Sequence, residues 1–422
     1  MAIYGKLVFI FGMIKNTFYR SFSTVKCATI MYPQTKAMTR ILKMLKKFTV
    51  RNYRQFNEPL EFDLTAGNYA FNPECTHNGL VKLALIYGEN GTGKSNLGWA
   101  IFDLVSHLTD NKYKSWTYDC VNAYSNTDIV EFEFHFVFFA NNKSANVIYK
   151  YQKKYGYPYG NLLYEQLIID DEIVIEYNIE KDIKSTLNGF QTLSDKSLNP
   201  EQNLSAIKYL YKNIKINDRD FNDIVFKKFF DFCNKIIHFR GLPIETSGYS
   251  HIGYNNIINI GDRILKDNKL KDLEKFLFDN GLDFKLIEID DGGKRIGVSM
   301  GNKEFLLFDI ASSGTRNLVI FYYWLQEAIS HQIPLLFIDE FDCSYHFALS
   351  EKIVEKLKQL PNTQVILTTH NTNLLSNELI RPDCGFVIDG KEIKSLNKLT
   401  VRELRYAHNL ERMYQAGEFD ND

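Results

Sequence analysis

The chain has 422 residues, 45% hydrophobic and 24% charged, which is long enough for one large core with an insertion or for about two to three domains. Its formal net charge of −1 gives no global field that would draw it to nucleic acid or a membrane. Six cysteines without a C-x-x-C pair argue against a structural zinc site and indicate a cytoplasmic protein, and no apolar stretch reaches the roughly 18 residues that cross a bilayer.

Residues 1–43 differ in composition from the rest of the chain. The first acidic residue is Glu58, and a short apolar run, Leu7–Ile14, lies between two lysines. Three interpretations are open: a targeting segment, a basic arm for nucleic acid, or a disordered or spurious extension upstream of the true start. Because the run is short and no small-residue cleavage site follows it, we expect the extension, with the domain beginning at Met44.

The next part of the chain, residues 44–180, predicts the N-terminal lobe of a nucleotide-binding domain. Phe48–Tyr53 and Leu60–Leu64 are typical of two short strands joined by a polar turn. Apolar and polar residues then alternate repeatedly between Ile129 and Ile179, the period of strands with one buried face. The pattern predicts an antiparallel sheet that flanks the nucleotide-binding core.

A glycine-rich segment within this lobe matches G-x-x-x-x-G-K-[ST] in full. It follows the apolar run Val81–Tyr87, and a helical pattern begins near Leu97. Convergent backbone N–H groups and a helix N-terminus favour a polyphosphate, while Lys94 would reach the β- and γ-phosphates and Ser95 would bind Mg²⁺. A chance glycine turn is the alternative, but its setting between strand and helix favours a nucleoside triphosphate. The predicted contacts are Gly88, Glu89, Asn90, Gly91, Thr92, Gly93, Lys94, Ser95 and Asn96.

Residues 181–280 are expected to form a mainly helical insertion. An apolar stripe from Phe226 to Ile237 has helical spacing, which is typical of core packing. No sustained heptads occur, so a long coiled-coil arm is not expected. Residues 281–422 then form the C-terminal lobe, which opens with a predicted hairpin of Phe284–Ile289 and Arg295–Val298.

An apolar run in the C-terminal lobe, Pro334–Ile338, ends in the carboxylates Asp339 and Glu340. Such a run predicts a strand buried on both faces of a parallel sheet. Asp339 would hold Mg²⁺ through water, and Glu340 would act as the general base that polarises the attacking water. The alternative is a pair of solvated acids at a strand end, which the glycine loop upstream makes the weaker interpretation.

Another buried-type strand, Gln364–Thr369, ends at His370. A histidine there can hydrogen-bond the γ-phosphate and report its presence. A structural histidine at a strand end is the alternative. Its position one strand after Asp339 and Glu340 favours the catalytic interpretation.

A Ser-Ser-Gly sequence precedes a helical pattern between residues 312 and 329. Hydroxyl groups and a glycine N–H at a helix start form an anion site, although a serine N-cap would explain the same residues. Within one protomer this site has no evident ligand. We expect Ser313 and Gly314 to close over the phosphates held by a second protomer.

The order of these motifs resembles an ABC-type ATPase head of the SMC, RecF and OLD branch. Phe48–Tyr53 is similar to the opening of that branch, Asp339–His346 to the Walker B motif and D-loop of bacterial OLD-like AAA/ABC ATPases, Thr368–Asn371 to their H-loop, and Arg405–Gly417 to their terminal helix. The resemblance implies a P-loop NTPase α/β fold with a mostly parallel core sheet. It also implies ATP and Mg²⁺ as cofactors and an ATP-dependent homodimer.

The chain departs from that pattern in three ways. Gln152 is only a weak candidate for the Q-loop glutamine, and the signature at Ser313 and Gly314 lacks the second glycine of transporter versions. The tail after His370 is too short for the Toprim nuclease of OLD proteins. The resemblance therefore implies the ATPase component of an anti-phage or abortive-infection system with a separate protein effector. The alternative is DNA repair or maintenance in the manner of RecF and SMC, which predicts a salt-dependent duplex affinity that rises with ATP. The sequence disfavours a transporter motor.

Overall fold

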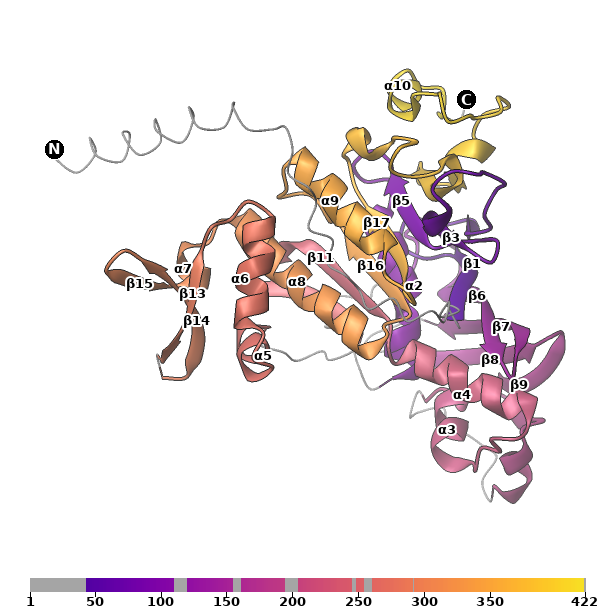
Figure 1. Cartoon of the computed structure of the whole chain (residues 1–422). Coiled ribbons are helices and arrows are strands. Elements are labelled where there is room, and N and C mark those ends of the chain that lie inside the picture. Colours follow the sequence, from indigo (N-terminus) through magenta and orange to yellow (C-terminus); the bar gives the residue numbers. More distant parts are fainter. Residues whose placement is uncertain are drawn as a thin grey trace. The chain divides into compact units, whose positions relative to one another are not determined.

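Two seven-stranded sheets form the frame of the described part of the chain in the computed structural model (Figure 1). The structure describes residues 43–109, 120–154, 161–193, 204–244, 248–253, 260–290 and 292–420. All of them belong to one compact unit, residues 40–422. The expectation for the N-terminal extension falls on residues outside this range, except for Lys43, where the first strand starts. Among the described residues, no helix has the length and apolar character needed to cross a membrane.

The first sheet has the strand order β10-β9-β8-β7-β6-β1-β2, and every neighbouring pair is antiparallel. Side chains of β6 alternate strictly between buried and half-buried, as one face packs on the core. This confirms the predicted antiparallel sheet. Its strands are β1 (Lys43–Arg51), β2 (Leu60–Asp63), β6 (Ile129–Ala140), β7 (Lys143–Lys154), β8 (Asn161–Ile169), β9 (Glu172–Asn178) and β10 (Lys181–Ser185).

The second sheet, the core sheet, has the order β12-β11-β16-β17-β5-β18-β19. The five inner strands are parallel, and β12 and β19 add antiparallel edges. Every residue of β5, β16 and β17 is buried, which confirms the strands predicted from unbroken apolar runs. The strands are β5 (Leu83–Tyr87), β11 (Ile237–Ile244), β12 (Gly248–Gly253), β16 (Leu335–Asp339), β17 (Gln364–Thr368), β18 (Gly385–Ile388) and β19 (Ile393–Ser395).

Residues 181–280, predicted as a mainly helical insertion, also contribute the strands β10, β11 and β12. β10 completes the antiparallel sheet, and β11 and β12 enter the core sheet, where β11 pairs with β16. The apolar stripe read as one helix ends at Cys233, and Ile237 already starts β11. Periodicity alone does not separate a short buried strand from a helical segment. Helices do fill the remainder: α3 (Ala206–Asn213), α4 (Phe221–Cys233), α5 (Ile260–Lys266) and α6 (Leu270–Asp279).

A small three-stranded sheet leads into the helices of the C-terminal lobe. β13 (Lys285–Asp290) and β14 (Lys294–Met300) confirm the predicted hairpin, and β15 (Lys303–Leu306) adds a strand that the sequence did not predict. The principal helices of the two lobes are α2 (Lys94–Leu108), α7 (Leu307–Ile310), α8 (Ser313–His331), α9 (Phe347–Lys358) and α10 (Leu410–Gln415). A two-stranded ribbon of β3 (Thr76–His77) and β4 (Leu80–Val81) precedes β5.

Candidate nucleotide-binding site

The glycine loop connects β5 to α2, as the motif predicted. Gly88, Gly91 and Gly93 have φ angles of 152°, 81° and 101°, a range that favours glycine. A Cβ atom on Gly88 would lie 2.7 Å from the Thr92 hydroxyl and closer still to a carbonyl of β18. The loop can therefore curl this tightly only with glycine at its first position.

Lys94 opens α2 and folds back over its own loop. Its side chain is buried, and its ammonium group donates hydrogen bonds of 2.8 Å to the carbonyls of Gly88 and Glu89. Burial lowers the pKa of Lys94, whereas Asp339 and Glu340 act to raise it. The loop therefore holds a cation whose charge is felt by both predicted carboxylates, in the position from which a lysine can bind phosphate oxygens.

The turn after β1 contacts the glycine loop and the start of α2. The Gln55 amide donates to the carbonyl of Gly91 at 3.1 Å, and the Arg54 guanidinium donates to the Asn96 side chain at 2.9 Å. Asn96 in turn donates to the Gln55 side chain. The sequence analysis gave Arg54 and Gln55 no role. The signal available was their position, directly after the opening segment Phe48–Tyr53 that carries part of the resemblance.

Asp339 and Glu340 follow each other at the end of β16, and Thr368 holds both. Asp339 is fully buried, and Glu340 has a φ of 50°, in the left-handed region. The Glu340 N–H donates to the Thr368 hydroxyl at 2.7 Å, and that hydroxyl donates to Asp339 Oδ1 at 2.6 Å. Thr368, the last residue of β17, therefore fixes the position of two adjacent acids. The sequence analysis placed Thr368 in the H-loop without assigning it this task.

One oxygen of each carboxylate is left without a hydrogen bond. Within the described residues, Asp339 Oδ2 and Glu340 Oε2 are shielded from solvent and accept none. Mg²⁺ prefers oxygen ligands of this kind and usually keeps waters and phosphate oxygens in its remaining positions. Ser95 lies on the first turn of α2 at the same carboxyl edge of the parallel strands. The donor chemistry of Asp339 and Ser95 therefore fits Mg²⁺.

Arg240 on β11 contacts both carboxylates, a contact that the sequence analysis missed. Arg240 lies opposite Asp339 in the parallel pairing of β11 with β16. Its Nη2 is 2.8 Å from Glu340 Oε1, and its Nε is 3.5 Å from Asp339 Oδ2. No signal was available, because β11 was interpreted as part of a helical region. Gln152, the weak Q-loop candidate, lies instead on β7 of the antiparallel sheet.

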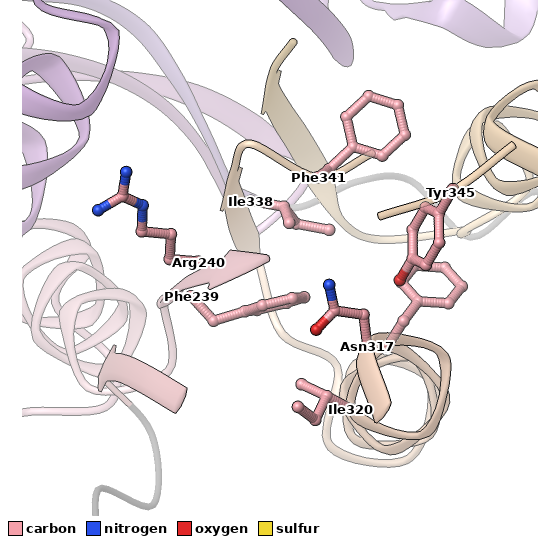
Figure 2. A pocket seen from close by; sticks show the side chains of 8 residues that line it. Phe239, Arg240, Asn317, Ile320, Ile338, Phe341 and Tyr345 are labelled. Carbon is pink, nitrogen blue, oxygen red and sulfur yellow. The ribbon is translucent and has the colours of Figure 1, made fainter. Parts of the chain in front are cut away.

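A small cavity lies beside Arg240, between β11, the end of β16 and the first turns of α8. Figure 2 shows Phe239, Asn317 and Tyr345 around it, while the guanidinium of Arg240 points away. The loop after β16 forms one wall and is held by Thr369, whose hydroxyl donates to Asp342 at 2.8 Å. The loop that follows the two carboxylates is therefore anchored to the end of β17.

His370 follows β17 and has an exposed side chain. Partial burial lowers its pKa, and the charge of Lys94 lowers it further, against the opposing effect of Glu340. An uncharged imidazole can donate one hydrogen bond and accept another. The charge of Lys94 acts on His370, and the role of His370 at the γ-phosphate stays a prediction.

The Ser-Ser-Gly segment opens α8. The Ser312 hydroxyl accepts from the Thr315 N–H at 3.2 Å, so the N-cap interpretation holds for Ser312. Ser313 is exposed. A Cβ on Gly314 would lie 2.7 Å from the carbonyl of Ser344, so α8 packs closely on the loop after β16. Within the described residues, no hydrogen bond joins Ser313 or Gly314 to the chain's own glycine loop.

A glycine loop, a buried acidic strand end and a mostly parallel sheet define a P-loop nucleotide-binding domain of the ABC/AAA type. Residues 83–376 match the sequence model of the family described as "AAA domain, putative AbiEii toxin, Type IV TA system". The chain belongs to this family, which is one of P-loop ATPases. No curated protein is similar enough in sequence to count as a match.

Solved structures of SMC heads are similar to this chain at a low level. The SMC head bound to the C-terminal winged-helix domain of ScpA has a TM-score of 0.41 and 14% identity, over 84% of this chain and 98% of that one. The SMC head domain from Thermotoga maritima gives 0.38 and 16%, over 83% and 98%. An Smc head with an extended coiled coil, bound to the C-terminal domain of ScpA derived from Pyrococcus furiosus, gives 0.41 and 14%, over 85% and 98%.

Proposed function

We propose that this protein binds and hydrolyses ATP and acts as an ATP-dependent dimeric switch. The observation that carries the proposal is the cluster at the carboxyl edge of the core sheet. There the charges of a buried lysine in the glycine loop, two adjacent carboxylates and a histidine act on one another. Two of the carboxylate oxygens accept no hydrogen bond within the described residues. Structural polar groups are normally satisfied, so this arrangement favours a ligand.

Each side chain has a defined task in this proposal. Lys94 exchanges the two loop carbonyls for β- and γ-phosphate oxygens, and the loop N–H groups bind the rest of the polyphosphate. Ser95 and Asp339 would hold Mg²⁺, which when bound neutralises phosphate charge. Glu340 accepts a proton from the attacking water. His370 donates a hydrogen bond to the γ-phosphate.

The exposed start of α8 supports the dimer. Ser313 is exposed and makes no hydrogen bond to the glycine loop of its own chain within the described residues. The helix α8 is long enough for its N-terminus to attract an anion. Gly314 rests on Ser344, in the loop that continues from Asp339 and Glu340. Closure of a second protomer over the nucleotide would therefore act on the loop that carries Asp339 and Glu340. The γ-phosphate is the group that distinguishes the closed state from the open state, as a switch requires.

The variant Glu340→Gln tests the dimer. It removes the general base and leaves the binding residues intact, so ATP and Mg²⁺ should convert it to a stable dimer in sedimentation velocity. Lys94→Ala combined with Glu340→Gln is the matched control and should stay monomeric. A Glu340→Gln protein that binds ATP and stays monomeric at saturation would contradict the dimeric switch.

We further propose a cytoplasmic role as the ATPase component of an anti-phage or abortive-infection system with a separate effector. The family description, which names a toxin of a type IV toxin–antitoxin system, supports this. Among the described residues, Cys75, Cys233, Cys343 and Cys384 are free thiols, which suits a reducing compartment. Phage plating on cells that express the protein with its neighbouring genes tests the role. Protection that is lost in Lys94→Ala supports it, and equal plating with and without the wild-type protein contradicts it.

A further inference from the structure

Arg240 lies where a metal ion would be expected to act. Its guanidinium joins Glu340 Oε1 at 2.8 Å and Asp339 Oδ2 at 3.5 Å. Asp339 Oδ2 is the oxygen that accepts no hydrogen bond among the described residues. The position is set by the backbone, because β11 pairs in parallel with β16 and aligns Arg240 with Asp339.

The two carboxylates require a positive charge when no ligand is present. Asp339 is fully buried and Glu340 is largely buried, and two adjacent ionised carboxylates in such a place repel each other. Among the described residues, Arg240 is the one basic side chain within 4 Å of either carboxylate. Lys94 is also near, but its ammonium group is bound to the carbonyls of Gly88 and Glu89.

We infer that Arg240 is a tethered cation that competes with the divalent metal for Asp339 and Glu340 and keeps the nucleotide-free site inactive. The inference rests on the proposed function, which gives the metal its role. A guanidinium and a metal dication would oppose each other beside Asp339, because like charges repel strongly in a shielded site.

Arg240 has room to move. One third of its side chain is exposed, against about one hundredth for Asp339. The neighbouring residue Phe239 and the stem of Arg240 border the small cavity next to Asn317 and Phe341 (Figure 2). The Asp339 carboxylate accepts a hydrogen bond from the Thr368 hydroxyl, and the Glu340 backbone N–H donates to the same hydroxyl. Displacement by a metal would therefore move the arginine and leave Asp339 in place.

The binding of Mn²⁺ alone, without nucleotide, tests the inference. Arg240→Met keeps an unbranched chain and removes the charge, so the Mn²⁺ affinity measured by electron paramagnetic resonance should rise by about tenfold or more. The gain should disappear in Arg240→Met combined with Asp339→Asn, which locates the ion. Arg51→Met is the matched control, because Arg51 forms an exposed pair with Glu131 on the antiparallel sheet. An unchanged or weaker Mn²⁺ affinity in Arg240→Met would overturn the inference.

A second measurement uses the wild-type protein and so does not depend on the folding of Arg240→Met. The Nε–Hε resonance of Arg240 can be assigned by its loss in Arg240→Lys. Addition of Mg²⁺ and ATP should shift this resonance as the ion pair opens, and a resonance that stays unchanged at saturation would overturn the inference. The two proposals can fail separately. If the proposed function is wrong, the wild-type protein binds no ATP, whatever the Mn²⁺ affinity of Arg240→Met.

Discussion

Two pairs of buried carboxylates lie in different regions of the protein and have opposite surroundings. Glu165, on β8 of the antiparallel sheet, accepts hydrogen bonds from Tyr149 at 2.5 Å, Ser205 at 2.7 Å and the N–H of Ala206 at 2.6 Å. Asp103, on α2, accepts from Lys153 at 2.6 Å and Tyr151 at 2.8 Å. These two acids bind α2, α3 and the antiparallel sheet together.

Asp339 and Glu340, at the edge of the core sheet, have fewer hydrogen-bond partners. They share one arginine, and each retains an oxygen without a hydrogen bond within the described residues. Glu340 also has a left-handed backbone conformation, which is costly for a residue other than glycine. Burial alone therefore does not identify a functional acid. A buried carboxylate whose oxygens all accept hydrogen bonds indicates a structural role. A carboxylate at a strand end that keeps an oxygen without a hydrogen bond indicates a site where a ligand supplies the missing contact.

Substitution of Glu165 by alanine should produce the largest loss of stability in this comparison. It leaves the Tyr149 and Ser205 hydroxyls and the start of α3 without their acceptor, so the free energy of unfolding should fall by about 3–5 kcal/mol. ATP affinity of the folded protein should not change. Urea unfolding measures the first effect and titration calorimetry the second.

Glu176→Ala is the control for that experiment. Glu176 lies on the neighbouring strand β9, and its ion pair with Lys184 spans 3.8 Å and is half exposed. Glu176→Ala should lower the free energy of unfolding by less than about 1 kcal/mol. If Glu165→Ala lowers the free energy of unfolding no more than Glu176→Ala does, the hydrogen bonds of Glu165 do not have the structural role assigned to them.

Thr368→Val should have the next largest effect, on turnover. Valine keeps the volume and removes the hydroxyl that joins Asp339 Oδ1 to the Glu340 N–H. Loss of a group that orients a metal ligand typically reduces affinity or activity by about 10–100-fold, and we expect the ATP hydrolysis rate to fall by this factor. Steady-state phosphate release measures it.

Thr363→Val is the matched control for Thr368. Thr363 immediately precedes β17 and is buried, and its hydroxyl donates to the carbonyl of Ile333 at 2.7 Å. It lies at the opposite end of the strand from the site, so turnover should stay at the wild-type value. Equal losses of turnover in both variants would show that Thr368 acts through stability and not through the carboxylates.

The smallest expected effect is a pH dependence of stability from Glu165. Burial raises the pKa of Glu165, but the His107 ring nitrogen 3.3 Å away and the hydrogen bond from Tyr149 outweigh it and hold the pKa below its ordinary value. A depressed carboxyl pKa adds stability above the pKa of the unfolded chain, about 4.3, and this stability is lost as the pH falls through the folded pKa. The melting temperature of the wild type should thus fall more steeply below about pH 4.3 than that of Glu165→Gln. Parallel curves would contradict this.

The sequence predicted the elements whose patterns are local. The glycine loop, the apolar strands before Asp339 and His370, and the alternation in β6 each carry their signal within a few residues. The two parts that it did not predict depend on pairing between distant segments. β11 joins the core sheet 100 residues before Glu340, and Arg240 reaches the site only through that pairing. Thr368 is visible in the sequence, but its two hydrogen bonds depend on the register of β16 with β17.

The most direct test of the central claim is titration calorimetry of the wild-type protein and Lys94→Ala with ATP in the presence of Mg²⁺. The wild-type protein should bind ATP, and the affinity of Lys94→Ala should be lower by at least about a hundredfold, with both proteins equally folded by circular dichroism. Equal ATP affinities for the two proteins would contradict the assignment of the glycine loop and Lys94 as the site that holds the triphosphate.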